Sequence, residues 1–229
     1  MMNNLSTRQK ALIDACKKFH TTCDVGCDHG YIGVSLLKNK KTNFLIATDI
    51  SAPSVHKTEV LLKQHNLQKY ASIRVGDGLE TVKSSENVEQ IIIAGMGGKE
   101  IVHILSEYKS LKKTKHFVFQ PMNELQVFRK YLSDNNIKIQ KDIVIFDKKF
   151  YHIIIAKPQE NSSLSPFRQK WGAKTKDRNK DYFLWLAEKE KKLTKILNNL
   201  PKNNEKEKEI LKCLNDIKRI KATKGAKKC

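Results

Sequence analysis

The sequence predicts an α/β fold in which a largely parallel sheet ends in an antiparallel hairpin, followed by a helical hairpin. Short apolar runs alternate with amphipathic stretches over roughly the first 156 residues, as expected for βαβ units. Two late apolar runs, at 137–146 and 150–156, are separated by only Asp147-Lys148-Lys149, and no helix fits in that gap. Beyond Pro158 the apolar runs stop and helical periodicity takes over.

The chain begins with an expected amphipathic helix at residues 5–20. Ser6-Thr7 are expected to cap it, and its apolar face is formed by Leu12, Ile13, Cys16 and Phe19. Parallel strands are then expected at 22–26, 44–49, 71–76, 91–95 and 116–120, with helices between them at 30–40, 53–66, 98–109 and 123–135. Seven strands whose last two form a hairpin are the pattern of a Rossmann-like class I methyltransferase domain. A dinucleotide-binding Rossmann domain more often has a sixth parallel strand at that place.

Composition divides the chain into four segments. We expect the α/β domain at 1–158, a polar linker at 159–181, a helical hairpin at 182–221 and a basic tail at 222–229. The hairpin is expected to be coiled-coil-like, because both of its stretches carry apolar residues on one helical face and a tight turn separates them.

The chain has a formal net charge of +20. Residues 157–229 contain 21 lysine and arginine residues against nine acidic ones, so this third of the chain carries more than half of the excess. Such a field favours a polyanionic partner, because each neutralised phosphate releases condensed counterions. Solubility, together with a composition rich in lysine and asparagine, is the other explanation for the charge.

Cysteines and apolar segments limit the cellular setting. The five cysteines form no CxxC pair and no zinc-ligand spacing, so we expect reduced thiols and no metal. The first twenty residues lack the apolar core of a signal peptide, and no run approaches 18 apolar residues. We therefore expect a cytoplasmic protein that is not bound to a membrane. A monomer is a separate expectation.

Four loops at the ends of the first four strands carry the chemistry. The first is DVGCDHG, residues 24–30, where Gly26 allows a sharp turn and close approach to a ligand. Asp28 stands where a GxGxxG motif would have glycine. Asp49, 23 residues after Gly26, ends the second strand and suits the two hydroxyls of a ribose, although an acid there can also cap the next helix.

The third and fourth loops extend this pattern. Asp77 lies between Gly76 and Gly78 and suits the exocyclic amine of adenine, although an ordinary tight turn would look the same. The fourth strand ends in AGMGG, residues 94–98. Because open α/β sheets bind ligands at the carboxyl ends of their strands, the four loops predict an adenosine-containing cofactor. The predicted cofactor-binding residues are Asp24, Gly26, Cys27, Asp28, His29, Gly30, Asp49, Ile50, Asp77, Gly78, Ala94, Gly95, Met96 and Gly97.

The chain resembles the bacterial tRNA (adenine(22)-N(1))-methyltransferases over about residues 5–157. The segments that carry the resemblance are LSTR, DVGCDHGYIGVSLL, ATDIS, RVGDGLE, IIIAGMGGKEI, FQPMNE and FYHIIIAK. This resemblance implies S-adenosyl-L-methionine as cofactor and methyl transfer to N1 of adenine 22 in tRNA. It also implies a Rossmann-like domain followed by a coiled-coil-like extension.

The reaction that the resemblance implies makes modest demands on the protein. Neutral adenine N1 has a free lone pair, so alignment can supply much of the rate. The product base is cationic, so a nearby carboxylate favours the transition state, and Asp28 is the first candidate. Its alternative role is hydrogen bonding to loop amides. Tyr31 and Asn123 complete the expected catalytic set, with Asn123 on the base edge.

Substrate contacts are expected at Arg8, His29 and Arg129. His29 can line the target pocket or stack on the base, but it can equally be a packed structural residue. Because N1 lies on the Watson–Crick edge, the target base must be unpaired or flipped out. The two arginines are expected near the carboxyl edge of the sheet, where they would contact phosphates.

The sequence is compatible with three other functions. A nicotinamide-dependent oxidoreductase would share the sheet and Asp49, but the chain lacks GxGxxG. A non-catalytic RNA-binding module would be expected to have lost a glycine or an acid from the loops. A methyltransferase acting on another RNA base is the nearest alternative.

Overall fold

The computed structural model describes residues 5–108, 111–160, 162–172, 174–201 and 205–225. The chain forms two compact units, residues 1–174 and 175–229. The first unit contains the sheet and every residue expected at the cofactor site.

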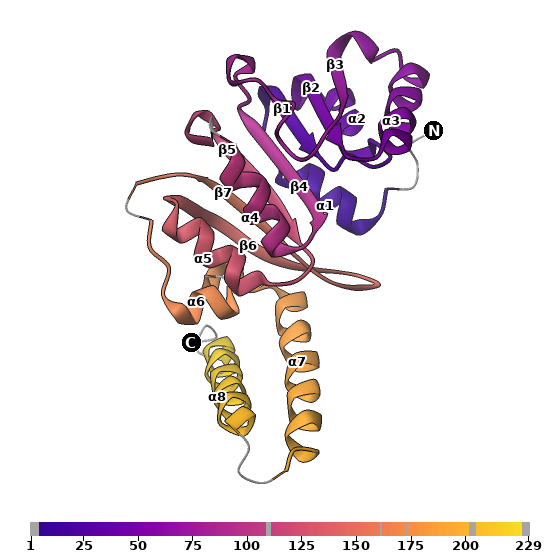
Figure 1. The fold of residues 1–229 in the computed structure, drawn as a ribbon. Helices are drawn as coiled ribbons and strands as arrows, with labels where there is room; N and C mark the ends of the chain where they lie inside the picture. The colour runs from indigo at the N-terminus through magenta and orange to yellow at the C-terminus, as the bar shows by residue number, and fades with distance from the viewer. Residues whose placement is uncertain (1–4, 109–110, 161, 173, 202–204, 226–229) are drawn as a thin grey trace. The chain divides into compact units, whose positions relative to one another are not determined.

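The first unit is built on a seven-stranded sheet with the order β3-β2-β1-β4-β5-β7-β6 (Figure 1). Strands β1 to β5 pair in parallel, while β7 is antiparallel to both of its neighbours, β5 and β6. The strands are β1 (Phe19–Val25), β2 (Thr42–Asp49), β3 (Ala71–Val75), β4 (Gln90–Met96), β5 (His116–Pro121), β6 (Ile137–Asp147) and β7 (Lys149–Pro158). This arrangement confirms the predicted class I methyltransferase fold.

Helices cover both faces of the sheet. The longer ones in this unit are α1 (Thr7–Ala15), α2 (Tyr31–Lys38), α3 (Ala52–Gln64), α4 (Gly98–Glu107) and α5 (Leu125–Asp134). One apolar cluster joins α4 and α5 to the central strands, through residues such as Ile101, Phe128 and Ile93. Residues of α1, α2 and α3 form two further clusters with other strand side chains, among them Leu12, Ile92 and Leu45. The sheet is therefore the middle layer of this unit, with helices packed on both of its faces.

Two predicted boundaries differ from the structure. The expected helix 5–20 ends at Ala15, because β1 already begins at Phe19, whose N–H donates to the carbonyl of Lys41. The segment 159–181, expected as a linker, contains a short helix, α6 (Pro166–Trp171), that packs beside α5. Short 3-10 turns lie at η1 (Gln68–Tyr70), η2 (Ser84–Glu86) and η3 (Leu111–Lys113).

The second unit is a helical hairpin. It contains η4 (Thr175–Asp177), α7 (Lys180–Asn198) and α8 (Glu205–Gly225). Asn179 caps α7, since its side-chain oxygen accepts from the Tyr182 N–H. Ile210, Ile217 and Ile220 are buried along α8. Residues 222–225, expected in the basic tail, belong to α8 instead, and residues 226–229 lie outside the described residues.

Candidate functional site

The strand order reverses between β1 and β4, and this is where the candidate site lies. From β1 the chain continues to β2 and β3 on one side, whereas β4 leads to β5 on the other. Such a switch point leaves a crevice at the carboxyl ends of the strands. A cleft of about 620 Å³ lies there, lined by Arg8, Gln9, Asp24, Gly26, Cys27, Asp28, His29, Tyr31, Ile32, Asp49, Ile50, Asp77, Gly78, Ala94, Gly95, Met96, Glu100, His103, Ile104, Met122 and Tyr151.

Local backbone geometry explains two of the predicted glycines. Gly26 has φ +70°, a conformation that other residues rarely adopt, and a Cβ at this position would lie 2.3 Å from Met96 Cε, so the end of that side chain would have to move. Gly95 has φ +86° and lies at a register shift between β4 and β5. This bulge opens the edge of the sheet beside the cleft.

Asp28 is held by its backbone, which leaves its side chain exposed. It has the left-handed φ of 47°, its N–H donates to Asp49 Oδ2 at 3.0 Å, and its carbonyl accepts from Thr58 Oγ1 at 3.0 Å. The carboxylate is 69% exposed and lies 3.7 Å from His29 Nε2. The loop is therefore fixed in place while the Asp28 carboxylate stays available at the cleft.

Asp49 is fixed by two backbone donors. Its Oδ2 accepts from the Asp28 N–H, and its Oδ1 accepts from the Ser51 N–H at 2.9 Å. The helix cap considered for Asp49 is supplied instead by Ser51, whose hydroxyl accepts from the Ser54 N–H. Each carboxylate oxygen still has a lone pair for a ligand.

Asp24 is a buried carboxyl group at the base of the cleft. It is 3% exposed, and its Oδ2 has no hydrogen-bond partner among the described residues. Burial raises the pKa of Asp24 to about 7, and the negative charge of Asp49 adds to the effect. A buried acid with one unpartnered oxygen suits a ligand that brings a positive charge or a donor.

The electrostatics of the cleft are opposite to those of the whole chain. Five acids line it, namely Asp24, Asp28, Asp49, Asp77 and Glu100, whereas Arg8 is the one lysine or arginine among the described residues that line it. The chain as a whole carries +20. The cleft therefore favours cationic or donor-rich ligands and disfavours a pyrophosphate.

Aromatic and polar side chains form the outer part of the cleft. The rings of His29 and Tyr31 stack with centroids 5.5 Å apart and an interplanar angle of 13°. The Arg8 guanidinium donates to Gln120 Oε1 at 2.7 Å and lies 5.4 Å from the centre of the Tyr151 ring. Planar groups are thus already arranged around an opening that a base can enter.

The structure brings most of the predicted residues together, with three exceptions among the loops. Gly30 packs against Thr58, where an added Cβ would meet that side chain at 2.6 Å. Gly97 is the N-cap of α4, and its N–H donates to Glu100. Asn123, predicted at the base edge, does not line the cleft, and its side-chain oxygen accepts from the Gly98 N–H at 3.2 Å. Asn123 thus holds the start of α4.

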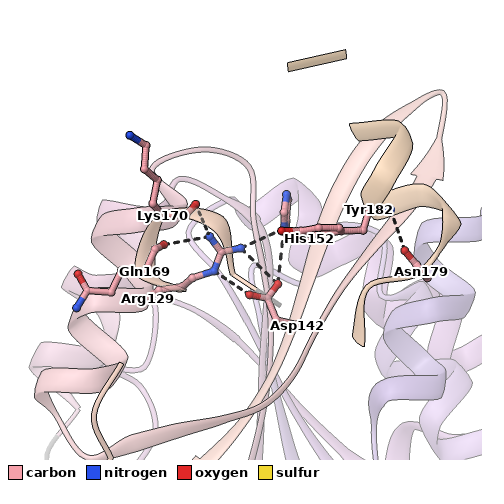
Figure 2. A network of polar contacts seen from close by, with 7 residues as sticks. All are labelled: Arg129, Asp142, His152, Gln169, Lys170, Asn179 and Tyr182. Atoms are coloured by element: carbon pink, nitrogen blue, oxygen red, sulfur yellow. Dashed lines mark hydrogen bonds and ion pairs between the residues drawn. The ribbon is translucent and has the colours of Figure 1, made fainter. Parts of the chain in front are cut away.

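The predicted phosphate contact of Arg129 is wrong. Arg129 is fully buried, and its Nε donates to Asp142 Oδ2 at 2.8 Å. Figure 2 shows the guanidinium enclosed by Asp142, His152 and the carbonyls of Gln169 and Lys170. The arginine therefore compensates a buried acid and caps the last turn of α6, and it cannot reach RNA from there.

Several lining residues were not predicted, including Glu100, His103, Met122 and Tyr151. Tyr151 could have been predicted, because the start of an antiparallel β7 must lie at the carboxyl edge of the parallel strands. Glu100 and His103 project from the first turns of α4, and no motif marks them. Among the described residues no group of acidic, histidine and cysteine side chains is suited to a metal ion. No described helix is long and apolar enough to cross a membrane.

The sheet order and the cleft at its switch point define a class I methyltransferase domain. A family model described as a methyltransferase domain matches residues 5–155, and the chain belongs to this family.

Individual proteins that are similar to this chain carry more specific names than the family model does. The tRNA (adenine(22)-N(1))-methyltransferase of Bacillus subtilis is 29% identical over 154 residues, which are 66% of this chain and 64% of that protein. The alignments with the curated relatives span 59 to 64% of those relatives' lengths. A solved structure of M. capricolum TrmK with S-adenosyl-homocysteine is 25% identical, with a TM-score of 0.84 over 94% of this chain and 96% of that one. A Streptococcus agalactiae protein of the NADB-Rossmann superfamily is 26% identical, with a TM-score of 0.87 over 95% and 97%.

Proposed function

We propose that this chain is an S-adenosyl-L-methionine-dependent methyltransferase that modifies N1 of adenine 22 in tRNA. The observation that carries the proposal is the acid-lined cleft at the switch point of a methyltransferase-family sheet. The names of the Bacillus subtilis relative and of the M. capricolum structure support the substrate and the cofactor. The acidic lining disfavours a nicotinamide dinucleotide, whose pyrophosphate needs donors and positive potential.

The residues of the cleft fit the proposed cofactor. Asp49 would accept from the ribose hydroxyls, Asp77 from the adenine amine, and the unpartnered Oδ2 of the buried Asp24 from the ammonium group. When bound, S-adenosyl-L-methionine supplies an electrophilic methyl group on a sulfonium centre. Gly26 keeps the floor of the cleft free of a Cβ.

The remaining residues of the cleft would act on the base. The Asp28 carboxylate would stabilise the positive charge that develops on the adenine, and the stacked pair of His29 and Tyr31 offers a surface for an extruded purine. Arg8 would contact the substrate beside Tyr151. We propose that the basic surface of the chain holds the tRNA. We also propose that the enzyme is cytoplasmic. A methyltransferase for another RNA base is the second candidate, because the cleft alone does not select adenine 22.

Replacing Asp28 by asparagine should lower turnover at least tenfold while the affinity for S-adenosyl-L-methionine changes little. The carboxylate is lost, but the backbone bonds of residue 28 to Asp49 and Thr58 are kept. Single-turnover methylation of tRNA and calorimetric titration of the cofactor measure the two effects. Asp14→Asn, an exposed acid of α1 outside the cleft lining, is the control. Near-normal turnover of the Asp28 variant would remove this residue from the mechanism.

The proposed function is tested by incubating the full chain with methyl-labelled cofactor and unmodified tRNA and then mapping the modified nucleotide. We expect one methyl group at N1 of adenine 22, and no transfer when that adenine is replaced by guanine. Methylation at another nucleotide would favour the second candidate. A chain that binds the cofactor but transfers no methyl group to any RNA would refute the proposal.

A further inference from the structure

A second, smaller pocket lies far from the cleft on the first unit. It has a volume of about 170 Å³ and is formed by the start of β6, the segment after β7, α6 and Lys174. It is lined by Lys138, Ile139, Gln159, Ser162, Ser163, Leu164, Arg168 and Lys174. Lys138 is near the beginning of β6, whereas Asp147 at its end binds the Arg8 N–H beside the cleft. Nine residues of strand place the two sites roughly 30 Å apart.

The pocket has a one-sided charge. Lys138, Arg168 and Lys174 line it, and none of its described lining residues is acidic. All three cations are partly buried, and none of them forms an ion pair within the part of the chain that the structure describes. Partial burial of three like charges without a counter-charge is unfavourable. The pocket is therefore complementary to an anion.

The neutral groups of the pocket narrow the kind of anion. The Ser162 and Ser163 hydroxyls and the Gln159 amide add hydrogen-bond donors beside the guanidinium of Arg168. A planar guanidinium fork with hydroxyl and ammonium donors is the donor set that phosphate oxygens prefer. The mixture is thus suited to one phosphate group.

The acidic cleft indicates where that phosphate comes from. A cleft lined by five acids repels a phosphodiester backbone, so an RNA whose base enters it must be held elsewhere. From the charge and the donors of the pocket we infer that the site around Lys138, Arg168 and Lys174 binds a backbone phosphate of the RNA substrate. This inference rests on the proposed function. An elongated RNA spans both sites at once, whereas a free nucleotide occupies only one.

The test compares two charge-matched double variants in the full chain. Lys138→Gln with Arg168→Gln removes two charges from the pocket but keeps much of the aliphatic stems. Lys57→Gln with Lys63→Gln removes two exposed charges from α3, at the opposite edge of the sheet. The affinity for tRNA is measured by fluorescence anisotropy between 50 and 200 mM salt, roughly the range over which such contacts weaken strongly.

We expect the pocket variant to bind tRNA about tenfold more weakly at low salt, with a salt slope shallower by about one, while the α3 variant keeps the wild-type slope. Cofactor affinity should be the same in all three proteins. Lys174→Gln, outside any helix or strand, should shift the slope in the same direction and serves if the double variant does not fold. Equal slopes for the wild-type and pocket proteins, or equal losses in both double variants, would overturn the inference.

Two further arms separate the possible failures. If inorganic phosphate raises the melting temperature of the wild type but not of the pocket variant, while both bind tRNA equally, the pocket is a small-anion site and the RNA contact is refuted. If the wild type neither binds nor methylates tRNA, the proposed function fails together with the inference. Normal methylation by a wild type whose salt slope matches that of the pocket variant removes only the inference.

Discussion

Replacing Arg129 by leucine should lower the free energy of unfolding by roughly 3–5 kcal/mol. The substitution leaves the Asp142 carboxylate buried without its main counter-charge and leaves two carbonyls at the end of α6 without their donor. Burial is the largest single influence and would raise the pKa of Asp142, but the charges and hydrogen bonds of Arg129 and His152 together outweigh it and hold the pKa at about 2. Urea unfolding at pH 7, followed by circular dichroism, measures the loss.

Two comparisons show whether the effect belongs to the buried pair. Lys130→Leu, which breaks an exposed pair with Asp134 on the same helix, should change stability by less than about 1 kcal/mol. Arg129→Leu combined with Asp142→Leu should recover part of the loss, since no uncompensated charge remains. If Arg129 instead contacted phosphate, its single variant would stay stable and would show a shallower salt slope for tRNA, contrary to the geometry of Figure 2.

Arg8 lines the cleft, whereas Arg129 is buried, and this contrast shows where prediction from the sequence ends. The positions of strands and loops along the chain follow from local apolar periodicity. Because parallel strands end at the same edge of a sheet, the residues at the ends of β1, β2 and β4 could be placed in one cleft. Whether an arginine on a helix faces solvent depends on what packs against it. Arg129 is buried because Asp142 of β6 and the carbonyls of α6 meet it, and those partners lie 13 to 41 residues away. No local pattern records that meeting.

The glycines show a similar limit. The AGMGG segment was predicted to lie at the cofactor site, and the register between β4 and β5 shifts within it, at Gly95. It did not reveal which neighbour requires the small residues. Gly98 lies so close to the carbonyls of Asn123 and Glu124 that a Cβ would approach them within 2.9 Å. Contacts within the protein therefore determine part of the fourth loop. Of the residues predicted from this loop, only Ala94, Gly95 and Met96 line the cleft.

The Asp24→Asn substitution should stabilise the cofactor-free protein at pH 8 and weaken cofactor binding at the same pH. The raised pKa of Asp24, about 7 against 3.8, means that the folded chain keeps a proton that the unfolded chain has released. Stability contributed by this group therefore falls as the pH rises from about 4 to 7 and stays low above that range. Removing the charge should restore up to about 4 kcal/mol at pH 8, measured by urea unfolding without ligand.

Cofactor binding should have the opposite dependence on pH. If the ionised Asp24 accepts the ammonium group of S-adenosyl-L-methionine, affinity should rise about tenfold between pH 6 and pH 8 as the carboxyl loses its proton. The Asp24→Asn protein is the control, because it lacks the Asp24 carboxyl group. Calorimetric titration of both proteins at four pH values gives the difference, and identical pH profiles would mean that Asp24 holds no positive group of the ligand.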